Sequence, residues 1–309
     1  MQMQPFFNLP DHQSAKEGAL RKHLDSKMVM RWLPLYELCL YSGSCNRAAG
    51  SSCYSQATLN RAHRSVVQLL EEAESKQLAN LLATLRTTAQ QLRTAEDGCR
   101  LEVDDFIPSL LVGHGLQVES WVRKTADLSA SLVLIGDGIC DAFVGSLYEL
   151  GMEDNKKLLE FQGKRYVAQA LTRVPLWGVG PVDVPFNEAA ETKILSLEGG
   201  LSHPRLLRHL ESLGYRIQTT SARRKERQYQ PMAHLVHHLR LPLQPLSGQF
   251  CVIEPKPIDH DVIGLVYSAS YAEEQPYFHS LMEQLANQLR QTLAEQSRAA
   301  DMIMKLNGG

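Results

Sequence analysis

The stretch LPLYELCLYSGSCNRAAGSSCYSQATLNR, residues 33–61, decides the fold of the N-terminal part of the chain. Apolar side chains lie along one helical face from Arg31 to Leu40, and Gly43-Ser44 interrupts this helix before a second short one that includes Ala48-Ala49. Ser55 is a cap signal, because its hydroxyl can accept hydrogen bonds from the free N–H groups of the next helix. Short helices separated by two turns predict a helix-turn-helix unit near residues 31–67.

The second helix of such a motif enters the major groove of DNA, so its first turns are the candidate reading surface. Gln and Asn side chains pair with adenine edges, Arg with guanine or phosphate, and Ser or Thr with phosphate. The candidate DNA-binding residues are Ser44, Ser55, Gln56, Thr58, Asn60, Arg61 and Arg64. The alternative interpretation is that this polar helix start is only a solvated face.

A long helix is predicted between this unit and the rest of the chain. No Gly or Pro occurs from Ser51 to Asp97, and Gly98 ends the helical pattern. Apolar residues recur at steps of four and three, which is typical of a coiled-coil seam: Leu78, Leu82, Leu85, Ala89 and Leu92. Because the seam covers only about two heptads, an ordinary amphipathic helix packed on its own domain stays an alternative.

After Gly98 short β-type runs alternate with helical runs, which predicts a mainly parallel sheet of the α/β class. The predicted strands are Arg100–Val103, Gln117–Val122, Cys140–Val144, Arg165–Ala170, Ile194–Leu197, Arg216–Thr219, Phe250–Ile253 and Val262–Ser268. The predicted helices are Phe106–Val112, Leu128–Ile135, Pro204–Leu213, Pro231–His238 and Gln275–Met304. The proline-containing stretch from Pro175 to Glu191 is interpreted as a crossing between two lobes.

Composition excludes several classes of protein. With 309 residues, 44% apolar and 21% charged, the chain is typical of a soluble globular protein of about two domains. No apolar run reaches the ~20 residues that span a bilayer, and the N-terminus lacks the layout of a secretion signal, so we expect a cytoplasmic protein. The six cysteines form no CxxC pair, and no nucleophile elbow or phosphate loop occurs, so neither a zinc ribbon nor an enzyme is expected.

The spacing of small and polar residues in the N-terminal unit resembles that of LysR-type transcriptional regulators. The resemblance is carried by Leu33–Leu38, Ser42-Gly43-Ser44, Arg47-Ala48-Ala49 and Ser55–Arg61, and later by Gly138–Gly145 and Ile263–Tyr267. Cys45, Ser52, Tyr54 and Asn60 depart from the family pattern. So does the region from Val67 to Gly98, which lacks the motifs of the family's β-wing. Since the wing binds phosphates, its loss predicts weaker DNA binding or binding that depends on oligomerisation.

The resemblance implies a two-lobed sensor related in architecture to periplasmic binding proteins, with an effector between the lobes. Ligands of open α/β sheets bind beyond the carboxyl ends of strands and near helix N-termini. The candidate effector-binding residues are Asp104, Asp105, Gly136, Gly138, Gly200 and Ser202. The two carboxylates favour a cationic or polyhydroxylated ligand, and helix capping by Asp is the alternative.

The remaining signals have plainer explanations. His234, His237 and His238 share one face of the predicted helix, yet no convergent ligand from elsewhere is visible, so no metal site and no cofactor are expected. The basic run Arg223–Arg227 is interpreted as an exposed loop.

The sequence as a whole predicts a DNA-binding transcription regulator. Its parts are an N-terminal arm (1–29), a helix-turn-helix domain (30–67), a linker and dimerisation helix (68–97) and a two-lobed effector domain (98–309). The expected partners are double-stranded DNA, a small-molecule effector and a second copy or further copies in a homodimer or homotetramer. The alternatives are a ligand-binding or protein-interaction relative that has lost DNA binding, and a solute-binding or enzymatic α/β protein with an incidental helical arm.

Overall fold

The computed structural model describes residues 26–50, 52–72, 75–95, 99–104, 107, 120–124, 128–152, 155–181, 193–197, 203–218, 233–240, 250–252 and 256–307. The chain forms two compact units, Met1–Ala89 and Gln90–Gly309. The first unit is helical, and the second contains all the strands of the described chain.

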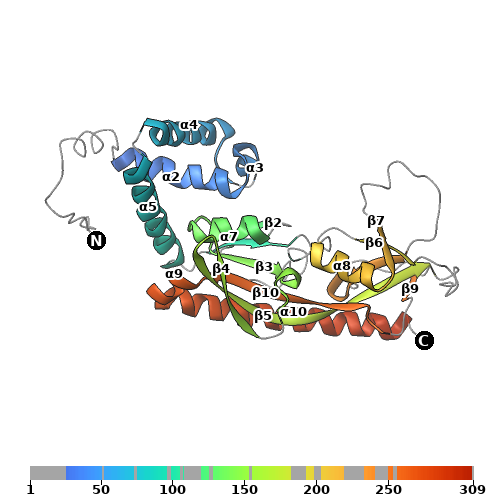
Figure 1. The fold of residues 1–309 in the computed structure, drawn as a ribbon. Helices are drawn as coiled ribbons and strands as arrows, with labels where there is room; N and C mark the ends of the chain where they lie inside the picture. Colours follow the sequence, from blue (N-terminus) through green and yellow to red (C-terminus); the bar gives the residue numbers. More distant parts are fainter. Residues whose placement is uncertain are drawn as a thin grey trace. The chain divides into compact units, whose positions relative to one another are not determined.

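The first unit contains α2 (Ser26–Tyr41), α3 (Cys45–Gly50) and α4 (Gln56–Glu72), drawn in blue tones in Figure 1. Leu33 and Tyr36 of α2 pack against Val66 of α4, which buries the apolar faces of both helices. Gly43, at φ 74°, occupies the left-handed region that ends α2. The predicted helices and the turns between them are thereby confirmed.

The next helix, α5 (Ser75–Ala95), begins shortly after α4 ends at Glu72. Both helices are regular wherever the chain is described between Val67 and Ala95. Leu82, a residue of the predicted seam, packs partly against the Leu33–Tyr36–Val66 cluster of its own unit. At least this seam position therefore contributes to the core of the helical unit.

The second unit is built on one mixed sheet in the strand order β2-β1-β3-β10-β5-β8-β6-β7. One lobe contains the parallel group β2 (Ser120–Lys124), β1 (Cys99–Val103) and β3 (Ala142–Ser146). The other contains the parallel group β8 (Ala233–His237), β6 (Lys193–Leu197) and β7 (Tyr215–Gln218). The predicted α/β class with two lobes is confirmed.

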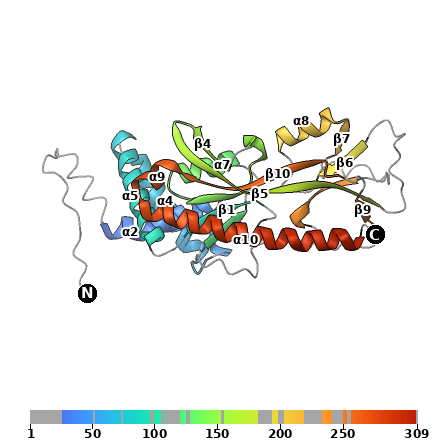
Figure 2. The ribbon, with the colours of Figure 1, turned by 90° about the horizontal axis from the view of Figure 1, so that it is seen from below.

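Two long antiparallel strands join the lobes: β5 (Lys164–Pro181) and β10 (Asp259–Ser268). Figure 2 shows them running side by side from one lobe to the other. The predicted crossing from Pro175 is thus strand as far as Pro181, while residues 182–191 lie outside the described chain. Because β10 runs antiparallel to its neighbours β3 and β5, the sheet is mixed rather than mainly parallel.

Two predictions of local structure were wrong or incomplete. The stretch predicted as a helix at Pro231–His238 contains β8, followed by the short helix η3 (His238–Arg240). Leu235, Val236 and His237 are all buried, so this central strand is covered on both faces and does not alternate as a surface strand would. A hairpin was missed altogether: β4 (Lys156–Phe161) pairs with the start of β5.

The remaining strand, β9 (Phe250–Val252), pairs with the end of β5. Of the predicted helix Phe106–Val112 only Ile107 is described, and the predicted strand Gln117–Val122 is described only from Ser120, where β2 begins.

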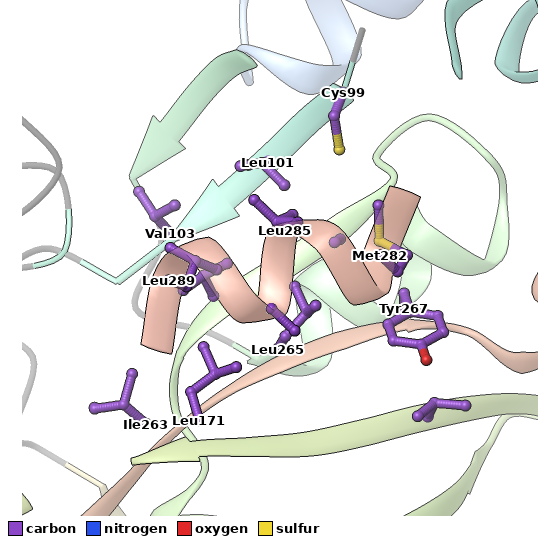
Figure 3. Packing of buried hydrophobic residues seen from close by; sticks show 14 of the residues in the cluster. Cys99, Leu101, Val103, Leu171, Ile263, Leu265, Tyr267, Met282, Leu285 and Leu289 are labelled. Carbon is purple, nitrogen blue, oxygen red and sulfur yellow. The ribbon is translucent and has the colours of Figure 1, made fainter. Parts of the chain in front are cut away.

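Helices cover both faces of the first lobe. Leu285 and Leu289 of α10 (Pro276–Asn307) pack against Leu101 and Leu265 of the sheet, as Figure 3 shows. On the opposite face of β1, Glu102 accepts a hydrogen bond from Ser131 of α7 (Leu128–Gly136). The other helices are α8 (Pro204–Ser212), α9 (Ala269–Glu274) and η1 (Tyr148–Leu150). None of the helices in the described ranges has the length and apolar content to span a bilayer.

Candidate functional site

The start of α4 is built by the serine predicted to cap it. Ser55 Oγ accepts a hydrogen bond from the Thr58 amide at 3.2 Å and lies 2.9 Å from Thr58 Oγ1. Ser44 does the same for α3, where its Oγ accepts from the Arg47 amide at 3.2 Å. These hydroxyls satisfy amides that have no partner within their helices, so both serines have a structural role whatever else they contact.

The two sides of α4 differ in chemistry. Leu59, Ala62 and Val66 are buried against the rest of the unit. Arg61 and Arg64 are exposed, and neither forms an ion pair with any residue that the structure describes. Gln56 is exposed and Asn60 half-buried at the N-terminal end of the same helix. The open face of α4 therefore presents two permanent positive charges beside amide and hydroxyl groups.

The residues predicted to bind an effector do not lie together. Asp104 follows β1 and is buried; its Oδ2 accepts from the Ser146 amide at 2.8 Å. A side chain at Gly145 would meet that carboxylate oxygen at 2.7 Å, so glycine is needed there for the close approach. The Asp104 carboxylate therefore binds the amide of the last residue of the neighbouring strand β3.

Gly136 and Gly138 lie near the amino ends of β1 and β3, away from Asp104. Gly136 ends α7, and the chain enters β3 where the Asp141 amide donates to the carbonyl of Arg100 at the start of β1. They are thus at the amino ends of β1 and β3, whereas Asp104 is at a carboxyl end. Asp105, Gly200, Ser202 and the basic run Arg223–Arg227 lie outside the described residues.

The amino end of β3 holds a buried ion pair. Asp141 accepts from Arg93 Nε and Arg93 Nη2, both at 2.8 Å, and from Gln90 Nε2 at 3.0 Å. The Arg100 amide donates to the same carboxylate at 2.7 Å. The Asp141 side chain is fully buried, and that of Arg93 is 15% exposed. The last turn of α5 is therefore fixed to the first lobe of the α/β unit.

The lobes meet where β3 and β8 end. Ser146, the last residue of β3, donates from Oγ to Asp261 Oδ1 on β10 at 2.8 Å. The other oxygen, Asp261 Oδ2, lies 3.8 Å from Nε2 of His237, the last residue of β8. All three side chains are buried. Carboxyl ends from both parallel groups thus converge on the crossing strands, at the position where open α/β sheets bind ligands.

A second set of contacts joins the lobes beside the first. Tyr148 of η1 donates its hydroxyl proton to Asp259, and His209 of α8 lies 3.5 Å from that carboxylate. Glu149 of η1 accepts a hydrogen bond from the Arg205 amide at 2.6 Å, at the N-terminus of α8. A carboxylate is favourable there, since helix N-termini carry partial positive charge. The Glu149 carboxylate therefore occupies the anion-binding position at the N-terminus of α8.

Burial controls the ionisation of Asp261. It raises the pKa of this carboxyl from 3.8 to about 7, and the charges of Asp104 and Asp259 act in the same direction. Hydrogen bonds from Ser146 and from the Val262 amide oppose the shift in pKa. The folded chain therefore holds a proton on Asp261 at pH values at which an exposed carboxyl group is ionised.

The histidine trio is not arranged as predicted. His234 and His237 lie three residues apart on β8, so they point to opposite faces of the sheet instead of sharing a helical face. His238 accepts a hydrogen bond from Trp177 Nε1 at 3.2 Å, and its Nε2 lies 3.2 Å from Asp301 on α10. Within the described ranges, no group of three or more His, Cys, Asp or Glu side chains could hold a metal ion.

Sequence reasoning missed the residues that join the lobes: Ser146, Tyr148, Glu149, Asp259, Asp261 and, as a junction residue, His237. A signal for Ser146 was present, since it lies two residues after the predicted strand Cys140–Val144 and strand ends are favoured ligand positions. No local signal existed for the pairing of Asp261 with Ser146, which are separated by 115 positions.

Comparison with known proteins finds similarity only among solved structures. No protein-family model matches the chain, and no curated protein is significantly similar to it. A cysteine mutant of OxyR from Corynebacterium glutamicum is 16% identical over 88% of this chain and 94% of its own, with a TM-score of 0.48. A full-length OxyR variant from Pseudomonas aeruginosa is 13% identical over 84% and 96%, with a TM-score of 0.44. A probable transcriptional regulator from Pseudomonas aeruginosa is 11% identical over 84% and 98%, with a TM-score of 0.46.

Proposed function

We propose that the protein is a transcription regulator of the LysR type. Its helical unit binds double-stranded DNA through α4, and its two-lobed unit binds a small-molecule effector. The observation that carries the proposal is the open face of α4, where Arg61 and Arg64 are exposed and form no ion pair with a described residue. Exposed arginine side chains suit phosphates and guanine edges, because their charge is permanent and their N–H donors form a planar fork.

The architecture of the α/β unit supports the effector half of the proposal. The carboxyl ends of β3 and β8 converge from different lobes on Asp261, so a ligand between the lobes would lie at a favoured position for binding. The protein acts in the cytoplasm, as a homodimer or homotetramer, and its role is regulatory rather than catalytic.

Electrophoretic mobility shift with the DNA upstream of the protein's own gene tests DNA binding. We expect a shift at low salt that weakens as salt rises, because binding releases counterions from phosphates. The double variant Arg61→Gln/Arg64→Gln should weaken binding and lower the slope of log K against log salt by about 2, one for each lost phosphate contact. Arg298→Gln, an exposed position on α10, is the matched control and should bind as the wild type does.

The helical structure of the described residues after the predicted reading helix favours a second candidate function. The described residues between Val67 and Ala95 are helical, and this is the region where the family resemblance would place the wing. Wing contacts add sequence-independent affinity, so a relative that uses its lobes for ligand or protein binding without DNA is the alternative. No shift at low salt with micromolar dimer would reject the regulator and favour this alternative.

A further inference from the structure

A cavity of about 600 Å³ lies on the two crossing strands of the α/β unit. Its walls come from the connection after η1 (Met152, Asn155), from β5 (Ala170–Arg173) and from β10 (His260, Val262). Small-molecule sites in proteins have volumes of roughly 300–1,000 Å³, so this cavity is large enough for a ligand. None of the residues predicted to bind an effector contributes to it.

The polar lining of the cavity includes one cation and other groups that can donate hydrogen bonds. Arg173 carries a permanent positive charge, is exposed, and forms no ion pair with the described residues. Asn155 and His260 also line the cavity, and their side-chain N–H groups can donate. Burial and the nearby Arg173 charge lower the pKa of His260, while Asp259 opposes the shift, so the imidazole stays neutral near pH 7 and donates one N–H.

The rest of the lining is apolar. Met152, Ala170 and Val262 supply hydrocarbon surface beside these donors. An exposed guanidinium with neighbouring donors suits a carboxylate, which accepts up to two parallel hydrogen bonds from arginine. We propose that this cavity binds a small carboxylic acid with an apolar body, with Arg173 holding its carboxylate.

The position of the cavity links a bound ligand to the contacts between the lobes. Successive side chains of β10 point to opposite faces, so His260 and Val262 face away from Asp259 and Asp261. Asp259 and Asp261 contact Tyr148, Ser146 and His237 at the junction. A ligand held against one side of β10 would therefore act on the strand that carries the inter-lobe contacts on its other side. The effector role of this ligand rests on the proposed function, whereas its binding does not.

Isothermal titration calorimetry on the full chain tests the site with matched probes. Cyclohexanecarboxylate and hexanoate should bind, and their neutral amides should bind at least roughly tenfold more weakly, because they lack the charge that Arg173 recognises. Arg173→Gln should remove most of this preference. Arg165→Gln, an exposed arginine on the same strand that pairs with Glu273, should leave it unchanged. Equal binding of acid and amide, or an unchanged preference in Arg173→Gln, overturns the site.

The same acids added to the mobility-shift assay separate the two proposals. A change in DNA affinity with cyclohexanecarboxylate, lost in Arg173→Gln, supports an effector site. Carboxylate binding without any change in DNA affinity overturns the effector role. If the chain binds the acid in a way that depends on Arg173 but binds no DNA, the cavity stands and the regulator proposal falls.

Discussion

Replacing Asp141 by Ala should destabilise the α/β unit by about 3–5 kcal/mol, the range for removing one partner of a buried ion pair. The size of this loss follows from the groups that lose their hydrogen-bond partner in the variant. Arg93 would keep a mostly buried charge, and the Gln90 side chain and the Arg100 amide would lose the acceptor that they share. Each buried donor left without a partner costs about 1–3 kcal/mol, and a charged one costs more. These separate costs are coupled through one carboxylate, so their sum is an upper bound.

Urea denaturation monitored by circular dichroism measures the loss in the free energy of unfolding. The matched control is Asp137→Ala, four positions earlier, whose carboxylate pairs with Lys164 at 2.7 Å but is 34% exposed. An exposed pair contributes about 0–1 kcal/mol, so the control should unfold nearly as the wild type does. Equal losses in Asp137→Ala and Asp141→Ala, or a loss below about 1 kcal/mol in Asp141→Ala, would refute the reasoning that burial makes this carboxylate important.

Three further predictions concern the junction and the core. The raised pKa of Asp261 means that the folded chain keeps a proton that the unfolded chain loses near pH 3.8, so the free energy of unfolding should decrease as pH rises toward about 7 and then level off. Denaturation at a series of pH values should show a flatter profile for Asp261→Asn, and parallel profiles would contradict the assignment. Glu149→Gln should lower stability by about 0.3–1 kcal/mol at low salt, because a charge is lost from the N-terminus of α8; a loss that persists unchanged in high salt would argue against this electrostatic origin. Leu285→Ala, at a fully buried position, should cost about 2–5 kcal/mol in urea unfolding, against less than about 0.5 for Leu158→Ala, which is 64% exposed.

Local sequence signals were sufficient to predict the helices of the helical unit and the turns between them. Gly43 ends α2 because glycine adopts its left-handed conformation without steric cost, and Ser44 and Ser55 begin α3 and α4 because their hydroxyls cap free amides. Each signal acts over a few residues, so it can be recognised in the sequence. The polar residues of α4 were also predicted from local sequence signals. Only the packing of Leu59, Ala62 and Val66 shows which side of α4 is covered. Arg61 and Arg64 lie on the opposite, exposed side of the helix.

The hairpin of β4 and β5 also has a local signal at its turn, although the hairpin was not predicted from the sequence. Gln162 and Gly163 both have positive φ, at 51° and 73°, which is the requirement of a tight two-residue hairpin turn. The helix predicted at Pro231–His238 failed for a different reason. A strand buried on both faces has no alternation of polar and apolar residues, so its pattern does not distinguish it from a short buried helix.

By itself, then, the sequence determined most helices, the caps at Ser44 and Ser55, most strands and the α/β class, since these depend on neighbours a few positions apart. The tertiary structure alone decided what meets at the crossing strands. Asp261 lies beside Ser146 and His237, and Arg173 shares a cavity with Met152 and His260, through pairings of distant strands. The burial of Asp104 and its bond to the Ser146 amide likewise depend on the pairing of β1 with β3. Sheet register and burial arise from contacts between residues far apart in the chain, and no local pattern encodes them.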